Sequence, residues 1–359
     1  MKFTINQVEL LAGLSIVKNS ISTNQANFLL QNVLLETKND SLKLATTDLH
    51  LFTSTEVKIE GEEDGKALLP LQKLLAIAQV MPEKSDVKCV LKKNSMTLSS
   101  GKVKFKITGA DIENVPVTPK ILNSINIKLE QKDLQQLIAH TDFAVHKDFT
   151  RPALAGTLFE IKDNKLNIVA TDGKRLAMSS QKVSGDLETR VIMPPKLTSE
   201  LKRLLTSGEL AIDVSDDKIA FTFGKTKIVS TLIEGMYPAY QKIIPEKTAP
   251  IVLDKDEFLL AIKRASVLVD SNSLDIKLKI EKGKLSIFKN VAEEQAVETL
   301  DIENKDLDFE VGFDAEFLAD GIKNCSKKVI DLEVIDNTRP GMIREDNFSY
   351  ILLPILIEE

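Results

Sequence analysis

Tryptophan is absent from the 359-residue chain, and there are only two cysteines and three histidines. Cys89 and Cys325 are too few for a disulfide scaffold, so we expect reduced thiols. His50, His140 and His146 lack the spacing of a histidine metal site. His140 falls on a predicted helix, where we expect a packed or solvated side chain. The composition therefore predicts neither a disulfide-stabilised fold nor a bound metal.

Long apolar runs and the common catalytic motifs are also missing. No stretch reaches the roughly 20 apolar residues of a membrane helix, and Met1–Ile5 is typical of a strand and not of a signal peptide. We therefore expect a cytoplasmic protein without a membrane anchor. The chain has no Gly-x-x-x-x-Gly-Lys-Ser/Thr loop, Gly-x-Ser-x-Gly elbow or Cys-x-x-Cys pair. These absences favour a binding or scaffold protein over an enzyme, and they predict no cofactor.

Acidic side chains outnumber basic ones by 53 to 47, and the net charge of −6 is not typical of a nucleic-acid-binding protein. The charges are unevenly distributed, with acidic groups concentrated in segments such as Glu62–Asp64 and Glu358–Glu359. Basic residues cluster on several predicted helices: Lys196, Lys202, Arg203, Lys263, Arg264, Lys323, Lys327 and Lys328. Two interpretations stay open. These residues are solvated spacers, or equivalent helices share one surface and form a basic track for phosphates.

One motif occurs twice and indicates how the chain is organised. Ala45–Phe52 (ATTDLHLF) and Ala170–Ala177 (ATDGKRLA) both place Thr-Asp after a short alternating strand pattern. Thr171 lies 171 − 47 = 124 residues beyond Thr47. We interpret Asp172-Gly173 as a two-residue turn between antiparallel strands, in which both residues tolerate a positive φ.

The same interval relates segments far from this motif. Apolar pairs four residues apart on one face of a predicted helix recur along the chain: Leu10 and Leu14, Leu134 and Ile138, Phe258 and Ile262. Leu69-Pro70 and Met193-Pro194 each open a second helix, with proline at the first helical position. In the third copy the second helix begins at Asp314. The sequence therefore contains three copies of one unit.

Each copy is expected to contain a strand, a helix, several alternating strands, a second helix and further strands. Two helices against antiparallel sheets form an α+β unit, and about 120 residues suffice for a separate core. We therefore predict three repeated domains, residues 1–122, 123–247 and 248–359. The boundaries near Leu122 and Lys247 fall in or beside the proline-bearing stretches Pro116–Pro119 and Pro245–Lys247.

Three motifs together resemble those of the bacterial DNA polymerase III beta subunits, the sliding clamps. They are Ala170–Ala177, Gly235–Tyr240 with the stretch to Pro245, and the terminal Tyr350–Ile355. The resemblance covers the whole chain and implies a head-to-tail homodimeric ring of six clamp-type domains. Double-stranded DNA would pass through a hole lined by the two helices of each domain. Such a subunit is non-catalytic and confers processivity in DNA replication.

The resemblance also implies the functional residues. A hydrophobic pocket between the second and third domains would bind short peptides of the polymerase III alpha subunit, the clamp loader and repair polymerases. Its wall would consist of Leu154, Thr171, Gly173, Lys174, Arg175, Leu176, Pro238, Lys242, Ile243, Pro340, Ile351, Leu353, Pro354 and Ile355. Its apolar side chains would anchor Leu or Phe of a peptide, and Arg175 would fix backbone carbonyls or acids at the rim.

Two further sets of residues follow from the same resemblance. The residues that face DNA would be Lys73, Arg151, Lys196, Lys202, Arg203, Lys263, Arg264 and Lys323. The dimer interface would include Phe105 on one contacting end of the subunit and Val267 and Leu268 on the other. An ordinary core role fits these three apolar residues equally well.

The chain departs from the family pattern at several points. Lys174 and Lys242 stand where His and Arg are frequent in the family. The first repeat has Thr23–Gln25 in place of a DNA-touching Arg-Pro, although Arg151-Pro152 is retained in the second repeat. An acidic tail, Leu356–Glu359, follows the last motif and leaves the preferred peptide open.

Two other classes of function remain as alternatives. Asp48 and Asp172 are the only acidic residues repeated within a shared motif, so one alternative is a three-domain enzyme whose acid is Asp172. No second carboxylate accompanies either residue as a catalytic partner, which favours a role in the turn. The other alternative is an oligomeric scaffold that does not act on DNA.

Overall fold

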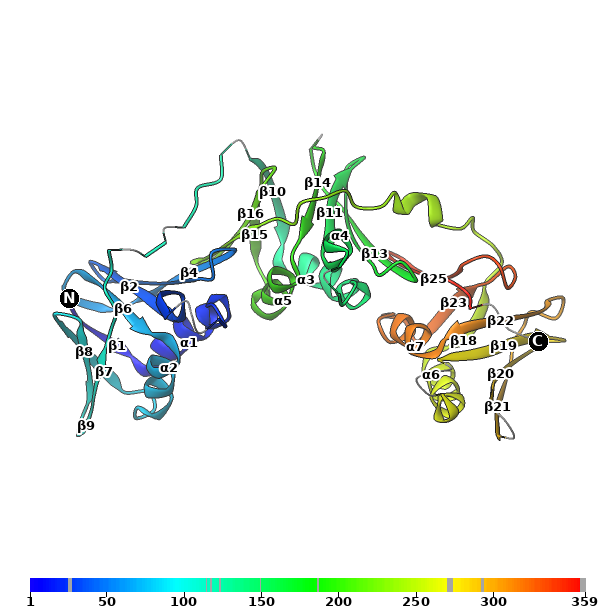
Figure 1. Cartoon of the computed structure of the whole chain (residues 1–359), viewed down its shortest axis with the longest axis horizontal. Helices are drawn as coiled ribbons and strands as arrows, with labels where there is room; N and C mark the ends of the chain where they lie inside the picture. Colours follow the sequence, from blue (N-terminus) through cyan, green and yellow to red (C-terminus); the bar gives the residue numbers. More distant parts are fainter. Residues whose placement is uncertain are drawn as a thin grey trace. The chain divides into compact units, whose positions relative to one another are not determined.

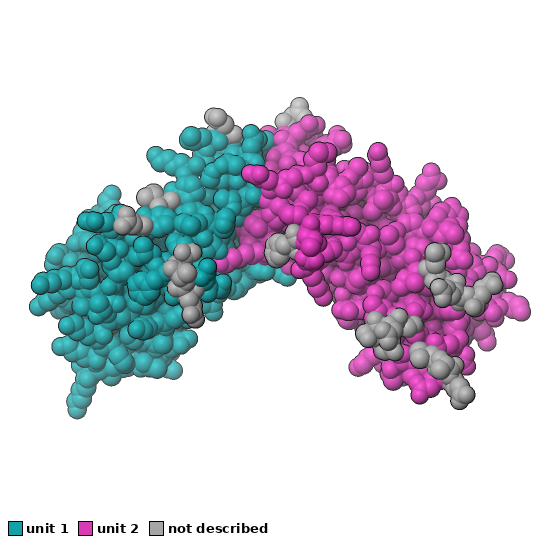
Figure 2. Space-filling view, in the orientation of Figure 1, with its two compact units in different colours: residues 1–132, 199–232 teal, residues 133–198, 233–359 magenta. Residues whose placement is uncertain are grey.

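The computed structural model describes residues 1–24, 28–113, 115–116, 118–122, 124–148, 150–185, 187–269, 274–291 and 294–355. Residues 1–132 and 199–232 form one compact unit, and residues 133–198 and 233–359 form the second (Figure 2). Parts of three predicted segments, namely Gln25, Val117 and the tail Leu356–Glu359, lie outside the described residues. The middle repeat is divided between the two units, because its strands pair with the first repeat in one unit and with the third repeat in the other.

Unit 1 contains two antiparallel sheets (Figure 1). The first has the order β5-β1-β7-β8-β9, with bounds Glu60–Glu63, Lys2–Asn6, Asp86–Lys92, Ser95–Ser100 and Val103–Thr108. The second has the order β10-β15-β16-β17-β4-β3-β2-β6, with bounds Ile125–Glu130, Glu209–Val214, Lys218–Phe223, Thr226–Thr231, Leu51–Lys58, Ser41–Thr47, Asn32–Lys38 and Gly65–Pro70. The repeats join where β17 pairs with β4 and Val229 lies opposite Phe52.

Helices α1 (Gln7–Val17) and α2 (Leu71–Val80) pack on each other in unit 1 (Figure 1). Phe3, Leu14 and Leu35 belong to the core that these helices form with strands of both sheets, and each is at most 2% exposed. Short 3₁₀ helices η1 (Lys18–Ser20) and η2 (Phe28–Gln31) follow α1. The alternating apolar pattern of the strands therefore supplies one side of the core, and the helix faces supply the other.

Unit 2 also contains two antiparallel sheets. One has the order β14-β11-β12-β13-β25-β24-β23-β18, with bounds Thr189–Met193, Thr157–Lys162, Lys165–Thr171, Arg175–Lys182, Phe348–Leu352, Gly341–Glu345, Val329–Glu333 and Ile251–Asp254. The other has the order β21-β20-β19-β22, with bounds Glu294–Asp301, Lys284–Val291, Asp275–Glu281 and Asp308–Asp314. The second and third repeats join where β13 pairs with β25.

The two main helices of the second repeat, α3 and α5, and of the third, α6 and α7, lie where the sequence predicts them, and further short helices accompany them. Their bounds are α3 Gln131–Ala139, α4 Pro152–Ala155, α5 Pro195–Leu204, α6 Lys255–Ala265 and α7 Ala315–Lys323, with 3₁₀ helices η3 Asp142–Ala144, η4 Tyr240–Ile243 and η5 Ser266–Leu268. Carboxylates cap the two helices of the third repeat, since Asp254 accepts from the N–H of Glu257 and Asp314 from the N–H of Phe317. Among the described residues, no helix is long and apolar enough to span a bilayer.

Two local predictions differ from the structure. Pro70 is the N-cap residue of α2 and not its first helical residue, and Pro194 likewise directly precedes α5. The hairpin at Asp172-Gly173 is present, but its turn is longer than two residues, because β12 and β13 are last paired at Thr171 and Leu176. Of the two predicted turn residues only Gly173 has a positive φ, which is 90°.

Candidate binding pocket

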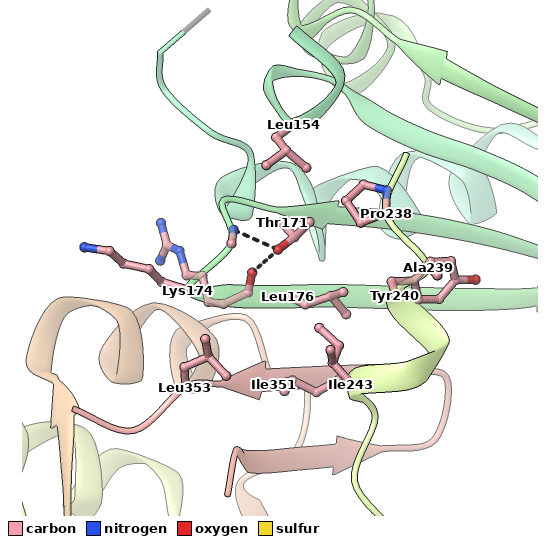
Figure 3. Close-up of a pocket in the computed structure, with 12 residues that line it drawn as sticks. Leu154, Thr171, Lys174, Leu176, Pro238, Ala239, Tyr240, Ile243, Ile351 and Leu353 are labelled. Atoms are coloured by element: carbon pink, nitrogen blue, oxygen red, sulfur yellow. Dashed lines mark hydrogen bonds between the residues drawn. The ribbon is translucent and has the colours of Figure 1, made fainter. Parts of the chain in front are cut away.

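Unit 2 contains a cavity of about 230 Å³ at the end of the β12–β13 hairpin. Figure 3 shows Leu154 of α4 on one side, Ile243, Ile351 and Leu353 on the other, and Leu176 between them. Ten of the residues predicted for the pocket line this cavity: Leu154, Thr171, Gly173, Lys174, Arg175, Leu176, Pro238, Ile243, Ile351 and Leu353. The structure therefore brings together side chains from four segments of the chain, and most of them are apolar.

Local hydrogen bonds shape the hairpin end of the cavity. The hydroxyl of Thr171 donates to the carbonyl of Arg175 at 2.5 Å and accepts from the N–H of Gly173 at 3.1 Å (Figure 3). The N–H of Leu353 donates to the carbonyl of Lys174 at 3.0 Å, which holds the C-terminal segment against the turn. The β13–β25 ladder continues this contact, with Leu176 opposite Ile351. The wall of the cavity is therefore built on paired backbone.

Two lining residues, Ala239 and Tyr240, were not predicted. The hydroxyl of Tyr240 donates to Oε2 of Glu160 at 2.5 Å, and that of Tyr237 donates to the carbonyl of Val169 at 3.2 Å. Burial and then the Glu160 carboxylate raise the pKa of Tyr240, so its phenol stays protonated as a donor. Ala239 and Tyr240 belong to the Tyr-Pro-Ala-Tyr motif that the sequence analysis singled out, but of that motif only Pro238 was predicted to line the pocket.

Arg175 holds the pocket together by internal contacts. Its side chain is 4% exposed, and it donates through Nε to Asp172 at 3.0 Å and through Nη1 to Asp320 at 2.9 Å. Nη2 donates to the carbonyl of Phe143, and the guanidinium lies 4.0 Å from the ring centroid of Phe317. Arg175 was predicted to fix a peptide at the rim; it lines the cavity, and each of its three side-chain nitrogens also donates to the protein.

The side chains of Asp172 and Asp48 accept hydrogen bonds from backbone N–H groups within their own turns. One carboxylate oxygen of Asp172 accepts from the N–H groups of Lys174 and Arg175, at 2.9 and 3.0 Å. Asp48 accepts in the same way from the N–H groups two and three residues ahead, at 3.0 and 2.7 Å. Residues of the Asx type commonly close turns in this manner. The pattern that repeats in the sequence is therefore a repeated turn geometry.

Four of the predicted pocket residues lie outside the cavity. Lys242 and Pro340 line an adjoining groove that shares Ile243 with it. Pro354 and Ile355 lie beyond Leu353, and the N–H of Ile355 donates to the carbonyl of Gly312 at 2.8 Å. That bond directs the chain toward β22. Arg151 lies close to the turn of the hairpin, because its Nη1 is 3.8 Å from the position that a Cβ on Gly173 would occupy. Arg151, predicted to face DNA, is therefore beside the pocket hairpin.

The other residues predicted to face DNA are on helices. Lys73 is exposed on α2, and Lys196 and Lys202 are half-buried on α5. In unit 2, α6 and α7 pack side by side (Figure 1), and Lys263 and Lys323 line one groove between them. The packing of α6 on α7 thus brings two cations of the third repeat to one groove.

Both arginines predicted on these helices have protein partners, and Lys323 pairs with Asp320 at 3.5 Å. In unit 1, Arg203 donates to the carbonyls of Ser15 and Ile16, both at 2.9 Å, and pairs with Glu200 at 2.6 Å. It therefore caps the last turn of α1, whose carbonyls have no helical partners. Arg264 pairs with Glu298 of β21 at 2.8 Å. A sequence pattern of helix-face cations does not reveal these pairings.

The predicted interface residues lie on or beside edge strands. Phe105 is on β9, the last strand of its sheet, and packs partly against the core. Leu268 is half-buried, whereas Val267 is 79% exposed in η5, which packs beside the edge strand β21. A pure core role therefore does not describe Val267.

The three histidines and two cysteines of the chain occupy sites that the structure describes. His140 directly follows α3 and is buried, and its ring packs against that of Phe348 with a centroid distance of 5.3 Å and the planes tilted by 53°. His50 and His146 make contacts in exposed turns. Cys89 and Cys325 are buried free cysteines. In the described part of the chain, no group of three or more His, Cys, Asp or Glu side chains is arranged to hold a metal ion.

Family comparisons agree with the fold along the whole chain. Models of the DNA polymerase III beta subunit match in succession, with the N-terminal domain at residues 1–119, the central domain at 128–239 and the C-terminal domain at 241–356. A beta sliding clamp of Pseudomonas putida is 29% identical over 99% of this chain and 100% of that protein. One of Buchnera aphidicola is 30% identical, with 98% and 99% covered.

Solved structures lead to the same family. A crystal structure of a Pseudomonas aeruginosa sliding clamp bound to griselimycin is 28% identical, with a TM-score of 0.96 over 99% of this chain and 100% of that one. The fold is therefore the three-domain clamp fold of helices and antiparallel sheets. The chain belongs to the DNA polymerase III beta subunit family, the sliding clamps, which are processivity factors of DNA replication.

Proposed function

We propose that two copies of this chain pair head to tail in the cytoplasm to form a ring of six domains around duplex DNA. The ring has no catalytic activity of its own and tethers the replicative polymerase to its template. A closed ring retains DNA by topology, so its phosphate contacts can be weak and exchangeable enough for sliding. Two different faces joined through a rotation that closes produce a ring and not a filament.

Edge strands in the first and third repeats support the dimer. The terminal sheets have β9 and β21 as edge strands, in unit 1 and unit 2 respectively. Val297 on β21 is 56% exposed and Val267 beside it is 79% exposed, while Phe105 lies on β9. An edge strand carries backbone groups able to pair with another chain. Pairing of β9 with β21 of a second copy would cover both edges and these valines.

The cavity of unit 2 carries the docking part of the proposal. The cavity is mostly apolar and opens beside the exposed side chains of Ile243 and Leu353. Its hairpin wall is held by the hydrogen bonds of Thr171. Such a site binds apolar anchors of an extended peptide and needs few polar contacts. We propose that the polymerase III alpha subunit, the clamp loader and repair polymerases use it in turn. Asp172 is engaged in the turn, which offers no support for an enzyme.

Ring closure is tested by solution mass and by DNA topology. Light scattering should give about twice the 39.8 kDa of one chain. With loader and ATP, the protein should remain on nicked circular DNA and leave the same DNA after linearisation. It should also lengthen the products of its own polymerase on primed circles. Equal retention on circular and linear DNA would contradict encirclement.

Docking is tested with a fluorescent peptide from the alpha subunit that carries Leu and Phe anchors. Leu353→Ala should weaken binding about tenfold, because burying a leucine side chain contributes on the order of 1.5 kcal/mol. Leu122→Ala, an exposed leucine outside the cavity, is the matched control. Equal affinity of the two variants would exclude the cavity as the docking site.

A further inference from the structure

A second groove of about 550 Å³ adjoins the cavity in unit 2. One side is the chain that runs from η4 to β18, and the other is the loop between β23 and β24. Ile243 lines both the cavity and this groove. A peptide that leaves the cavity over Ile243 therefore enters the groove directly.

The groove differs from the cavity in its charge. Its lining includes Lys242, Lys247 and Arg339 but only one carboxylate, that of Glu246. Within the described ranges, no ion pair involves Lys242 or Lys247. Arg339 pairs with Asp336 at 2.6 Å, and Arg175 in the cavity pairs with two carboxylates. The two lysines thus place positive charge beside an apolar pocket, on a chain whose net charge is −6.

The frame of the groove is well bonded. Glu333, whose side chain is 4% exposed, accepts from Nε of Arg344 at 2.9 Å and from the N–H of Thr248 at 3.1 Å. Arg344 also donates to the carbonyl of Pro245 at 2.8 Å, which fixes the segment that carries Lys247. These bonds position the chain between η4 and β18 and do not involve its lysines.

The opposite rim is a closed turn. The carboxylate of Asp336 accepts from the N–H groups of Thr338 and Arg339 and from Nε and Nη2 of Arg339. These bonds hold the pKa of Asp336 well below its usual range, with the Arg339 side chain as the largest cause. Arg339 remains 56% exposed, and its Nη1 has no partner in the described part of the chain. The turn therefore presents a positioned donor to the groove.

We propose that this groove binds the acidic flank of the partner peptide whose apolar anchors occupy the cavity. The inference rests on the proposed docking function and adds a specificity rule to it. Partners with Asp or Glu close to their apolar anchors bind more tightly than those without. Lys247 follows Ile243 by four residues, and four extended residues span at most about 13 Å. The carboxylates should therefore lie within about four positions of the anchor that contacts Ile243.

An acidic peptide suits the groove better than a nucleic-acid backbone. Ile243, Ile244 and Ile335 line it together with Pro245 and Pro340. These apolar groups can pack against the methylene groups of Asp or Glu side chains and of their neighbours. A phosphodiester backbone offers charge but little apolar surface. Continuity with the cavity also supplies the effective concentration that weak, exposed charge pairs need.

The experiment compares three peptides with one Leu- and Phe-containing core on the full-length protein. One carries two aspartates before the core, one carries them after it, and one has asparagines at all four positions. One acidic peptide should bind about three- to tenfold more tightly than the asparagine peptide at 50 mM salt, as expected for a few exposed pairs. The difference should shrink at 300 mM salt because of screening.

Variants of the protein localise the effect. Lys247→Gln combined with Arg339→Gln should abolish the preference for aspartate and leave the affinity for the asparagine peptide unchanged. Lys162→Gln, an exposed lysine at the far end of β11, should preserve the preference.

Each failure has its own pattern. Equal binding of all three peptides, with Leu353→Ala still weakening every one, refutes the acidic subsite and leaves docking intact. Binding that is insensitive to Leu353→Ala refutes docking itself. Loss of duplex DNA retention in the double variant, without a change in peptide preference, would assign the cations to DNA and overturn the inference.

Discussion

Replacing Asp320 with alanine should destabilise unit 2, because its carboxylate is one of two that neutralise a buried guanidinium. Arg175 is 4% exposed, and its Nη1 lies 2.9 Å from Oδ2 of Asp320. Asp172 supplies the second carboxylate at 3.0 Å. The pair joins β13 of the second repeat to α7 of the third, so its loss acts on the contact that also shapes the cavity.

The magnitude follows from burial. Breaking a buried ion pair costs about 3–5 kcal/mol when one charge is left uncompensated. Here Asp172 still pairs with Arg175, and Asp320 is itself 24% exposed, so water can partly replace it. We therefore expect a loss of about 2 kcal/mol for Asp320→Ala. Asp320→Asn keeps an acceptor for Nη1 and should lose about 1 kcal/mol.

Thermal unfolding followed by circular dichroism measures this effect. For a unit of this size, 2 kcal/mol corresponds to a fall in the melting temperature of roughly 4–8 °C. Asp346→Ala is the control, because Asp346 pairs with Lys327 at 2.7 Å while both side chains are more than half exposed. That pair should contribute nothing measurable. If Asp320→Ala shifted the melting temperature no more than Asp346→Ala, the buried network would have no role in stability.

Three further outcomes are expected. Leu49 has φ 80° at the position equivalent to Gly173, so Leu49→Gly should raise the free energy of unfolding by up to about 1 kcal/mol in urea titrations, and a decrease would contradict this strain. Burial lowers the pKa of His140 below its usual 6.5, so near and below that pH the unfolded chain binds more protons than the native one. The free energy of unfolding should therefore decrease as the pH is lowered below about 6.5, and His140→Leu should flatten that decrease in melting curves from pH 5 to 8. Burial raises the pKa of Cys89 and Cys325 to about 12, so native thiols should react slowly with a disulfide reagent at pH 8 and rapidly in guanidinium.

Much of the fold could be predicted because its signals are local. The positions of α1, α3 and α6 followed from apolar residues four apart, which lie on one helix face whatever surrounds them. The hairpin after Thr171 followed from its turn residues, although its length did not, because Asp172 accepts from N–H groups farther along the chain. Residues of the cavity were found through motif resemblance, which carries spatial information that spacing alone lacks.

The partners of charged side chains were beyond prediction. Arg175 bonds to a carboxylate 145 residues away, and Arg203 bonds to a carbonyl 188 residues away. Both cations sit in sequence patterns that equally suit a peptide or a phosphate. Nothing near them in the chain distinguishes a bonded guanidinium from a solvated one, since the difference depends on which distant helix packs beside it.

The threefold repeat, the kind of element at each position and the recurring Thr-Asp turns were determined by the sequence itself, because they depend on interactions among residues a few positions apart. Tertiary structure decided which strands join neighbouring repeats, as in the pairing of β13 with β25. It also decided that Tyr240 lines the cavity and that Lys247 and Arg339 line one groove beside it. These outcomes arise from packing between distant segments, whose free energy is not encoded in any single stretch of chain.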